Sequence, residues 1–520
     1  MKTRQNFVEK TFMDKLEETH KKRKTFTENM AIAYATSGSE LLDFNFKLSQ
    51  FRKMDEPEIM RAYSKVFFED PQTAVKFAFY VGDVRGGLGE RKIFRACMKW
   101  LATYKPNICK AVLRLIPVYT RWDNLVILVD NISIRSMVID IIKEQLREDC
   151  VNRKHGSGIS LLAKWMPSIN ASSKETKARA ALIARCMGAT PKEYRKMLSM
   201  LREYLDVTEV KTSSNRWGEI DYEAVPSMAN LKYGKAFMKH DFNRRQNYLS
   251  ALSKGTAKIN ASVAQPHDIV AKYYLEDGWR SYYTDIKKYD ETLEQMWKAL
   301  PNIVTENTLV VRDGSASMTS PVGNGKTTCL DVATALAIYC SEHNSPAWED
   351  KFITFSSSPE IVNLKNCKSL KDKLNVCDSH TDCSNTDIAK TMELILETAV
   401  ENNMSQEEMP RNILIISDMQ FDGRYSRNTS WNRTLFEEIA LEYDACGYQL
   451  PRIIFWNVSD RHADTIPMQD NEKGLILCSG FSINNMKMFM TGEVDPLKVL
   501  LEQINSPRYL PVEEALLEGH

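Results

Sequence analysis

The chain has 520 residues, 43% of them hydrophobic and 26% charged, with a formal net charge of +1. This length exceeds what one hydrophobic core supports and predicts two or more domains. No apolar run approaches the ~18 residues of a membrane span, and the N-terminal stretch lacks the apolar region of a secretory signal, so membrane and secreted classes are not expected. Eleven cysteines without a CxxC pair indicate free thiols and a cytoplasmic location.

Residues 1–300 predict an all-α module. Five segments between Glu56 and Asp149 carry apolar residues at three- and four-residue spacing, with short turns between them. They are EPEIMRAYSKVFFED, PQTAVKFAFYVGDV, ERKIFRACMKWLATY, NICKAVLRLIPVY and IRSMVIDIIKEQLRED. Consecutive helices of this length favour a HEAT-like α-solenoid, although no sequence period is visible. This half contains 51 Lys and Arg against 36 Asp and Glu, a net charge of +15, which suits a polyanionic partner.

The basic residues of this half gather in three stretches: DVRGGLGERKIFR, RWDNL and residues 151–200, which hold 10 Lys and Arg against 2 Asp and Glu. Cations interleaved with aromatic side chains suit phosphate contacts and base stacking. The alternative is a solvated helix face that pairs with the acidic second half. The predicted RNA-binding residues are Arg85, Arg91, Lys92, Arg95, Arg121, Lys164, Lys174, Lys177, Arg179, Lys192 and Arg195. Trp217 and Tyr222 are either a stacking platform or core.

Residues 301–520 predict an α/β domain. Five short runs rich in Ile, Val, Leu and Phe alternate with helical patterns, and they are TLVVRD, KFITFSS, NILIISD, RIIFWNV and GLILCSG. Buried strands alternating with helices predict a mostly parallel, doubly wound sheet. SINNMKMFM and PLKVLLEQI are expected to be its last helices. The net charge of this half is −14, from 18 Lys and Arg and 32 Asp and Glu.

Polar side chains follow two of the predicted strands. Asp313, Ser315 and Ser317 come directly after TLVVRD, and Asp418 follows NILIISD. Because ligands in doubly wound sheets bind beyond the carboxyl ends of strands at a switch point, we expect these side chains to lie together. Carboxylate and hydroxyl oxygens predict a Mg²⁺ or Mn²⁺ site with room for an outside ligand. The alternative is that the hydroxyls only cap turns and helices.

A third loop, CSNTDIAK, offers Thr386 to the same site, with Thr381 as a rival for that role. The adjoining CDSHTDC has zinc-like spacing in Cys377, His380 and Cys383, but no fourth ligand is near. We therefore expect this loop to shape the rim of the Mg²⁺ site.

Two glycine-rich strings fail their motif tests. GNGKTT ends like a phosphate-binding loop, but the first glycine position is Ser320, and eleven residues separate the strand end at Asp313 from Gly325. We expect a connection into a helix beginning near Cys329. GDVRGGLGER has helical patterns on both sides, so it is not a dinucleotide-binding turn.

The pattern Asp313, Ser315, Ser317, Thr386 and Asp418 resembles the metal-ion-dependent adhesion site of the von Willebrand factor A family. A helical-repeat module before such a domain is similar to TROVE-module ribonucleoproteins of the Ro autoantigen type, and VRGGLGER, RWDNL and KWMPS resemble landmarks of that module. Closer still is a large uncharacterised family of the same layout, whose signature resembles residues 191–241. The resemblance implies a helical ring that binds RNA.

The sequence therefore predicts a non-enzymatic RNA-binding protein. A helical ring or crescent holds RNA, and a Mg²⁺-dependent C-terminal domain closes it or recruits a partner through an acidic residue. The second hypothesis is a protein–protein adaptor that does not bind RNA. A metal-dependent hydrolase is third, because a single ion with few carboxylates and no convincing His base is a poor centre for activating water.

Overall fold

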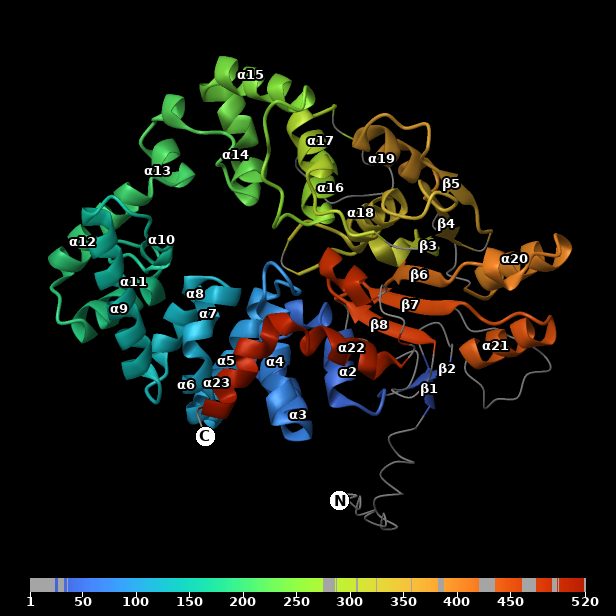
Figure 1. Ribbon diagram of the computed structural model, residues 1–520, viewed down its shortest axis with the longest axis horizontal. Coiled ribbons are helices and arrows are strands. Elements are labelled where there is room, and N and C mark those ends of the chain that lie inside the picture. Colours follow the sequence, from blue (N-terminus) through green and yellow to red (C-terminus); the bar gives the residue numbers. More distant parts are fainter. Residues whose placement is uncertain are drawn as a thin grey trace, which may run out of the picture.

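The computed structural model describes residues 24–26, 32–34, 36–274, 286, 288–304, 307–323, 325–356, 358–381, 388–419, 435–460, 474–488, 493 and 495–518. Their arrangement is an arc of helices that leads into an α/β part (Figure 1). No helix of these residues is long and apolar enough to cross a membrane.

The N-terminal half is largely helical, as predicted. The helices are α2 Glu40–Phe46, α3 Glu56–Glu69, α4 Pro71–Gly82, α5 Arg91–Tyr104, α6 Pro106–Val112, α7 Ile116–Tyr119, α8 Trp122–Val126, α9 Arg135–Lys154, α10 Leu162–Trp165, α11 Lys174–Cys186, α12 Pro191–Leu205, α13 Thr208–Ser213, α14 Ser227–His240, α15 Phe242–Ser253, α16 Pro266–Tyr274 and α17 Glu291–Lys298. The 3-10 helices are η1 Gln50–Arg52, η2 Leu113–Leu115, η3 Ile127–Asp130 and η4 Trp217–Glu219. A hairpin of β1 Lys24–Phe26 and β2 Ile32–Tyr34 precedes them and was not expected.

Local sequence explains where the long helices begin. The side chain of Asp55 accepts from the backbone of Glu58, whose carboxylate returns the bond, so α3 starts with a capping box. Thr190 and Glu193 do the same for α12. One predicted helix, NICKAVLRLIPVY, is instead divided into α6, η2 and α7. Pro117 falls within this stretch, and its missing N–H interrupts helical hydrogen bonding.

The C-terminal half contains a six-stranded sheet with the order β5-β4-β3-β6-β7-β8. Its strands are β3 Thr308–Asp313, β4 Lys351–Phe355, β5 Ile361–Asn363, β6 Asn412–Ser417, β7 Arg452–Asn457 and β8 Leu475–Ser479. All neighbours pair in parallel except β4 and β5, which are antiparallel. The five predicted strands are confirmed, and the edge strand β5 was missed. Its two outer residues are exposed, so it lacks the apolar run of a buried strand.

Helices accompany this sheet. They are α18 Cys329–Glu342, α19 Leu370–Ser379, α20 Ile388–Glu401, α21 Leu435–Ala445, α22 Pro496–Ile504 and α23 Leu510–Glu518, with 3-10 helices η5 Ala316–Thr319, η6 Gln406–Glu408, η7 Ile483–Met488 and η8 Pro507–Tyr509. Of the two expected final helices, PLKVLLEQI is α22, whereas SINNMKMFM yields only the short η7. The chain then continues into α23, which contacts α4 and α6 of the helical half.

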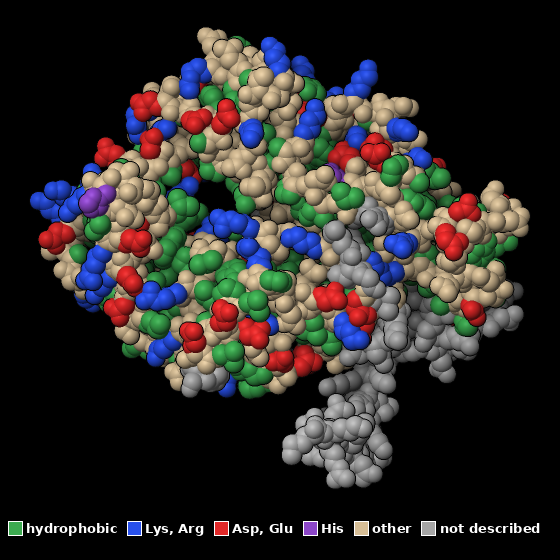
Figure 2. Space-filling model, in the orientation of Figure 1, with side chains coloured by type: hydrophobic (Ala, Val, Ile, Leu, Met, Phe, Trp, Pro, Cys, Tyr) green, Lys and Arg blue, Asp and Glu red, His purple; other side chains and the backbone are tan. Residues whose placement is uncertain are grey.

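Both ends of the helical arc contact the α/β part. At one end α2 contacts β8 and α22, and at the other α16 and α17 contact α18 and α19. The arc and the sheet domain together enclose an opening, and Figure 2 shows Lys and Arg side chains at its edge. The helices thus form a crescent that the α/β part closes.

Hydrogen bonds join the first helices to the carboxyl ends of β7 and β8. The Ser49 hydroxyl donates to the carbonyl of Ser459 at 2.5 Å, and the Ser49 amide donates to the Ser479 hydroxyl at 3.1 Å. The side-chain amide of Asn45 donates to the carbonyl of Leu477 at 3.4 Å. These groups are buried, so the bonds replace the water that the strand ends would otherwise need.

The glycine-rich loop between α4 and α5 receives the C-terminal segment. Asp83, which is fully buried, accepts hydrogen bonds from the Arg508 guanidinium, from the Tyr509 hydroxyl at 3.1 Å and from the Arg85 amide at 3.0 Å. A Cβ on Gly86 would collide with the Arg508 side chain, and one on Gly87 would lie 2.0 Å from the Tyr80 carbonyl oxygen. Gly86 therefore leaves room for this docking, and Gly87 for the close approach of the loop to α4.

The opposite end of the arc is fixed by Glu294 of α17. Its carboxylate accepts from the amides of Leu370, at 2.8 Å, and Lys371, at 3.2 Å, where α19 begins. A carboxylate at a helix N-terminus satisfies amides that lack partners within the helix and favours its dipole. Trp297 adds a bond from its indole nitrogen to Glu342 of α18 at 2.8 Å.

We predict that Asp83→Asn lowers the free energy of unfolding by about 3 kcal/mol, because it leaves Arg508 and Tyr509 without the buried carboxylate. Burial raises the pKa of Asp83, but hydrogen bonds from Arg508 and the amides of Arg85 and Gly86 hold it below 3.8, its ordinary value. The contribution of the carboxylate is therefore present above the ordinary pKa and is lost as pH falls through the native one. Denaturant unfolding should show a difference from wild type at pH 7 that diminishes as the pH falls below 3.8.

Glu144→Gln is the matched control, because it breaks an exposed ion pair with Arg114. Its effect should stay below about 0.5 kcal/mol. Equal effects of the two substitutions would contradict a special role for the Asp83 contact.

Candidate functional site

The structure brings together three of the five predicted metal ligands at the carboxyl end of β3 and places a fourth, Asp418, after β6. These two strands are neighbours, and the chain leaves them toward opposite edges of the sheet. The Asp313 carboxylate accepts from the Ser315 amide at 2.8 Å and from the Ser417 hydroxyl at 2.6 Å. The hydroxyl oxygens of Ser315 and Ser317 are 3.0 Å apart.

Burial and the repulsion between two carboxylates raise the pKa of Asp313 at the end of β3. Asp313 is fully buried, and Asp418 is 3% exposed. Burial raises the pKa of Asp313 to about 7, and the negative charge of Asp418 adds to the increase. Two neighbouring carboxylates and two hydroxyls form an all-oxygen donor set, and a divalent cation would offset the repulsion between the carboxylates. The residues present therefore fit Mg²⁺ or Mn²⁺.

Thr386, the fifth predicted ligand, lies outside the described residues. Its rival Thr381 has a different role: its hydroxyl accepts from Arg312 at 2.9 Å and donates to the carbonyl of Cys377 at 2.9 Å. Arg312, on β3, is fully buried and also donates to the carbonyl of His380 at 3.0 Å. This arginine anchors the loop that leads toward Thr386. Its signal in the sequence is a charged residue directly after the apolar run 309–311 of β3.

The motifs rejected from the sequence have structural roles. His380 and Cys377 bind Arg312 through their carbonyls, and among the described residues no three His, Cys, Asp or Glu side chains are grouped as metal ligands. Around the GNGKTT stretch, residues 323–328, Thr328 forms an isolated β-bridge with Pro321, and α18 begins at Cys329 as expected. The amide of Gly323 donates to Asp460, which lies three residues after the end of β7 and whose carboxylate also pairs with Lys53 at 2.6 Å.

The helical half presents a second candidate site, formed by three arginines around Asp123 of α8. Arg95 and Arg121 each place an Nη2 atom 2.7 Å from Asp123 Oδ2, and Arg91 Nη1 lies 3.7 Å from the same oxygen. Burial lowers the pKa of Arg95; Asp123 opposes this, and the charges of Arg91 and Arg121 add to it. We call these four residues the basic cluster. Three positive charges share one carboxylate.

An aromatic ring adjoins the basic cluster. The Arg121 guanidinium lies 4.0 Å from the ring centre of Trp165 on α10, and Lys164 Nζ lies 5.7 Å from it. Lys164 also pairs with Glu209 at 3.0 Å. Helices α8 and α10 contact one another and border the opening in Figures 1 and 2. Arg121 and Lys164 belong to separate basic stretches of the sequence, and the packing of α8 on α10 brings them together.

The other predicted RNA-binding residues do not join this cluster. Lys92 donates to the carbonyls of Arg52, at 2.9 Å, and Met54, and Arg179 pairs with Asp130 at 2.6 Å. Both serve contacts within the chain. The remaining predicted residues have exposed side chains, and they are Arg85, Lys174, Lys177, Lys192 and Arg195.

Burial decides between stacking platform and core for Tyr222 but not for Trp217. Tyr222 is 4% exposed and packs with Phe237 and Tyr248 around the buried guanidinium of Arg245, so it is core. Trp217 is partly buried at the edge of this small core and stacks on His240, with ring centres 4.5 Å apart.

Comparison with known proteins covers both halves. The family described as "Domain of unknown function (DUF2828)" matches residues 27–121 and 133–308. The family described as "Domain of unknown function (DUF7788)" matches residues 307–505, so the two matches meet at the start of β3. "Uncharacterized protein L728" of Acanthamoeba polyphaga mimivirus is 29% identical over 521 residues, which cover 92% of this chain and 86% of the viral protein.

We predict that Asp313→Asn removes stabilisation by Mg²⁺. The raised pKa of about 7 means that ionised Asp313 disfavours the metal-free fold as pH rises from 4 toward 7. The isosteric amide removes this penalty, so the metal-free variant should be more stable than wild type at pH 8. Saturating Mg²⁺ should stabilise wild type by about 2–3 kcal/mol and leave the variant unchanged.

Thermal unfolding with and without Mg²⁺ measures both effects. Asp444→Asn, an exposed change on α21, is the control and should respond to Mg²⁺ as wild type does. If Mg²⁺ stabilised Asp313→Asn as much as wild type, the ion would not bind at Asp313 and Asp418.

Proposed function

The chain belongs to the DUF2828 family, and we propose that it is an RNA-binding protein without enzymatic activity. In this proposal the helical arc holds RNA, and the α/β part carries a Mg²⁺-dependent site for a protein partner. The observation that carries the proposal is the basic cluster, where Arg91, Arg95 and Arg121 share the single carboxylate of Asp123.

The charge balance of the cluster favours a polyanion. Three guanidinium groups and one carboxylate leave an excess of two positive charges, within a half whose net charge is +15. Guanidinium groups match phosphate oxygens in shape and release counterions when they bind nucleic acid. Trp165 beside Arg121 supplies a flat apolar surface for a base, which single-stranded RNA exposes and a duplex does not.

The position of the cluster supports the same proposal. α8 and α10 border the opening between the arc and the α/β part, where an extended strand can reach basic side chains from within. We propose that the arc is a HEAT-like module of the TROVE type. Because the α/β part completes the enclosure, movement of that part would admit or release RNA.

We further propose that the α/β part is a von Willebrand factor A domain. The placement of Asp313, Ser315 and Ser317 beside the β3–β6 switch point supports this. These three residues with Thr386 and Asp418 would hold Mg²⁺. Bound there, the ion would offer a coordination position to a carboxylate of a partner protein. The ten cysteines that the structure describes are all free thiols, which supports a cytoplasmic location.

A protein–protein adaptor is the second candidate. Lys92 and Arg179 are engaged within the chain, so part of the positive charge serves internal contacts rather than a polyanion. In this alternative the exposed cations of α11 and α12 would dock on acidic protein surfaces.

We predict opposite effects of two substitutions in the basic cluster. Arg121→Gln removes one phosphate contact, so it should weaken binding of an oligouridine RNA and reduce the dependence of log K on log salt by about one unit. Asp123→Asn removes the competing negative charge and should strengthen binding about three- to tenfold, equivalent to ~1 kcal/mol. Fluorescence anisotropy across a salt series measures both.

Arg114→Gln, which removes an exposed arginine paired with Glu144, is the control and should change affinity little. No RNA binding by wild type at about 100 mM salt would favour the adaptor. Sustained Mg²⁺-dependent RNA cleavage that Asp313→Asn abolishes would contradict the absence of enzymatic activity.

A further inference from the structure

An open groove with a volume of about 680 Å³ lies between α3 and the end of α5. α3 is at the outer rim of the arc, away from the opening (Figure 1). Its contribution to the groove is one helix face, with lining residues at three- and four-residue spacing, which include Met60, Arg61, Ser64 and Phe68. The groove shares no residue with the proposed RNA and metal sites.

Three aromatic rings form the apolar part of the groove. The ring centre of Trp100 lies 6.2 Å from that of Phe68 and 5.5 Å from that of Tyr104. Trp100 is nearly buried, whereas Phe68 is 72% exposed and Tyr104 is 61% exposed. The Tyr104 hydroxyl donates to no acceptor in the described part of the chain. Large exposed rings around one hollow, with a donor still available, are typical of a surface that packs against a partner.

Two cations border these rings. Lys105 Nζ lies 5.7 Å from the ring centre of Phe68, and the exposed Arg61 precedes Phe68 by two turns of α3, about 11 Å along the helix. Neither cation forms an ion pair with a described residue, and none of the described lining residues is acidic. Glu56, at the start of α3, is already paired with Lys99 at 2.7 Å. The groove is therefore an aromatic surface with an excess of positive charge.

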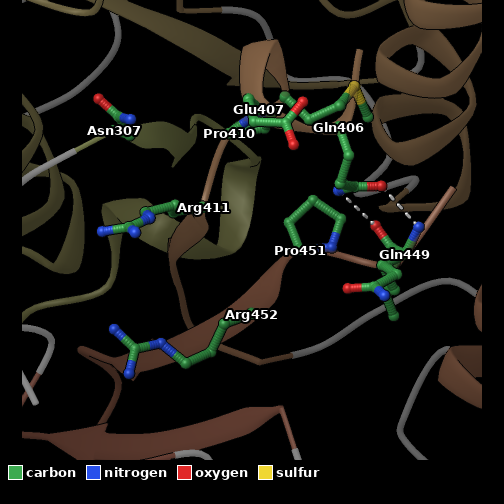
Figure 3. A pocket seen from close by; sticks show the side chains of 10 residues that line it. Asn307, Gln406, Glu407, Pro410, Arg411, Gln449, Pro451 and Arg452 are labelled. Atoms are coloured by element: carbon green, nitrogen blue, oxygen red, sulfur yellow. Dashed lines mark hydrogen bonds between the residues drawn. The ribbon is translucent and has the colours of Figure 1, made fainter. Parts of the chain in front are cut away.

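A smaller hollow of about 510 Å³, at the amino ends of β6 and β7, lacks this combination. Its described lining residues include the acid Glu407 and no aromatic ring. Figure 3 shows the Gln406 side chain and the Gln449 backbone joined by two hydrogen bonds, of 2.8 and 3.3 Å. The Arg452 guanidinium donates to the Asn412 side chain and to the Glu493 carbonyl. The polar groups of this hollow thus serve contacts within the chain.

We infer that the groove between α3 and α5 binds a proline-rich segment of a partner protein that carries acidic residues three positions apart. Such segments form a polyproline II helix, whose proline rings dock in aromatic-lined grooves and whose carbonyls are free to accept a bond from the Tyr104 hydroxyl. This helix has three residues per turn and rises ~3.1 Å per residue, so acids at positions i and i+3 share one face about 9 Å apart. That spacing matches Arg61 and Lys105 along α3.

Other occupants fit the groove less well. An amphipathic helix needs a continuous apolar groove, whereas Arg61 and Ser64 interrupt the apolar lining between Met60 and Phe68. A single strand of RNA needs a row of cations along its backbone, whereas Lys99, the preceding cation of α5, is held by Glu56. The aromatic rings and the two separated cations therefore favour a protein segment.

Fluorescence anisotropy of a labelled peptide with the repeat Pro-Pro-Glu, titrated with the full chain, tests this inference. Phe68→Ala and Tyr104→Ala, which change exposed side chains and leave the core intact, should each weaken binding about fivefold. Arg61→Gln should weaken binding about threefold, an effect that high salt reduces. A Pro-Pro-Gln repeat, which has no charge, should bind more weakly. A Pro-Glu repeat, which has more charge but no two acids three positions apart, should also bind more weakly.

Ile132→Ala and Arg195→Gln are matched controls, because they change an exposed apolar side chain and an exposed cation elsewhere in the helical half. Both should leave peptide affinity unchanged, and so should Arg121→Gln, whether or not the chain binds RNA. Equal losses in Arg195→Gln and Arg61→Gln, tighter binding of the Pro-Glu repeat, or no peptide binding at millimolar concentration would overturn the inference. Weaker oligouridine binding in Phe68→Ala, without peptide binding by wild type, would assign the groove to RNA instead.

Discussion

The carboxyl edge of the sheet imposes the constraint on which the rest of the molecule depends. Parallel strands end there in polar groups that must be hydrogen-bonded or hydrated. At β7 and β8, Asn45 and Ser49 of the helical half meet this need, and Lys53 neutralises Asp460. The helical half thus covers one side of the edge. The ends of β3 and β6 lie outside these contacts, and this is where Asp313 and Asp418 are placed.

The loop between α4 and α5 connects this closure to the basic cluster. On one side its Asp83 holds Arg508 and Tyr509, which fixes the C-terminal segment against the arc. On the other side it leads directly into α5, whose first turns carry Arg91 and Arg95. The position of these arginines relative to Asp123 therefore depends on the same loop. Part of the basic stretch that suggested nucleic-acid binding in the sequence also has this structural role.

Sequence alone predicted features with a local or periodic cause. Strands buried on both faces appear as continuous apolar runs, so β3, β6 and β7 were predicted, and the strand-end rule placed Asp313 beside Asp418. Features that depend on contacts distant in sequence were not predictable. In the sequence Lys92 is simply a cation in a basic stretch. Only the packing shows that it donates to the carbonyls of Arg52 and Met54. The docking of α23 on α4 and α6 likewise depends on contacts between residues far apart in the sequence, so it could not be predicted.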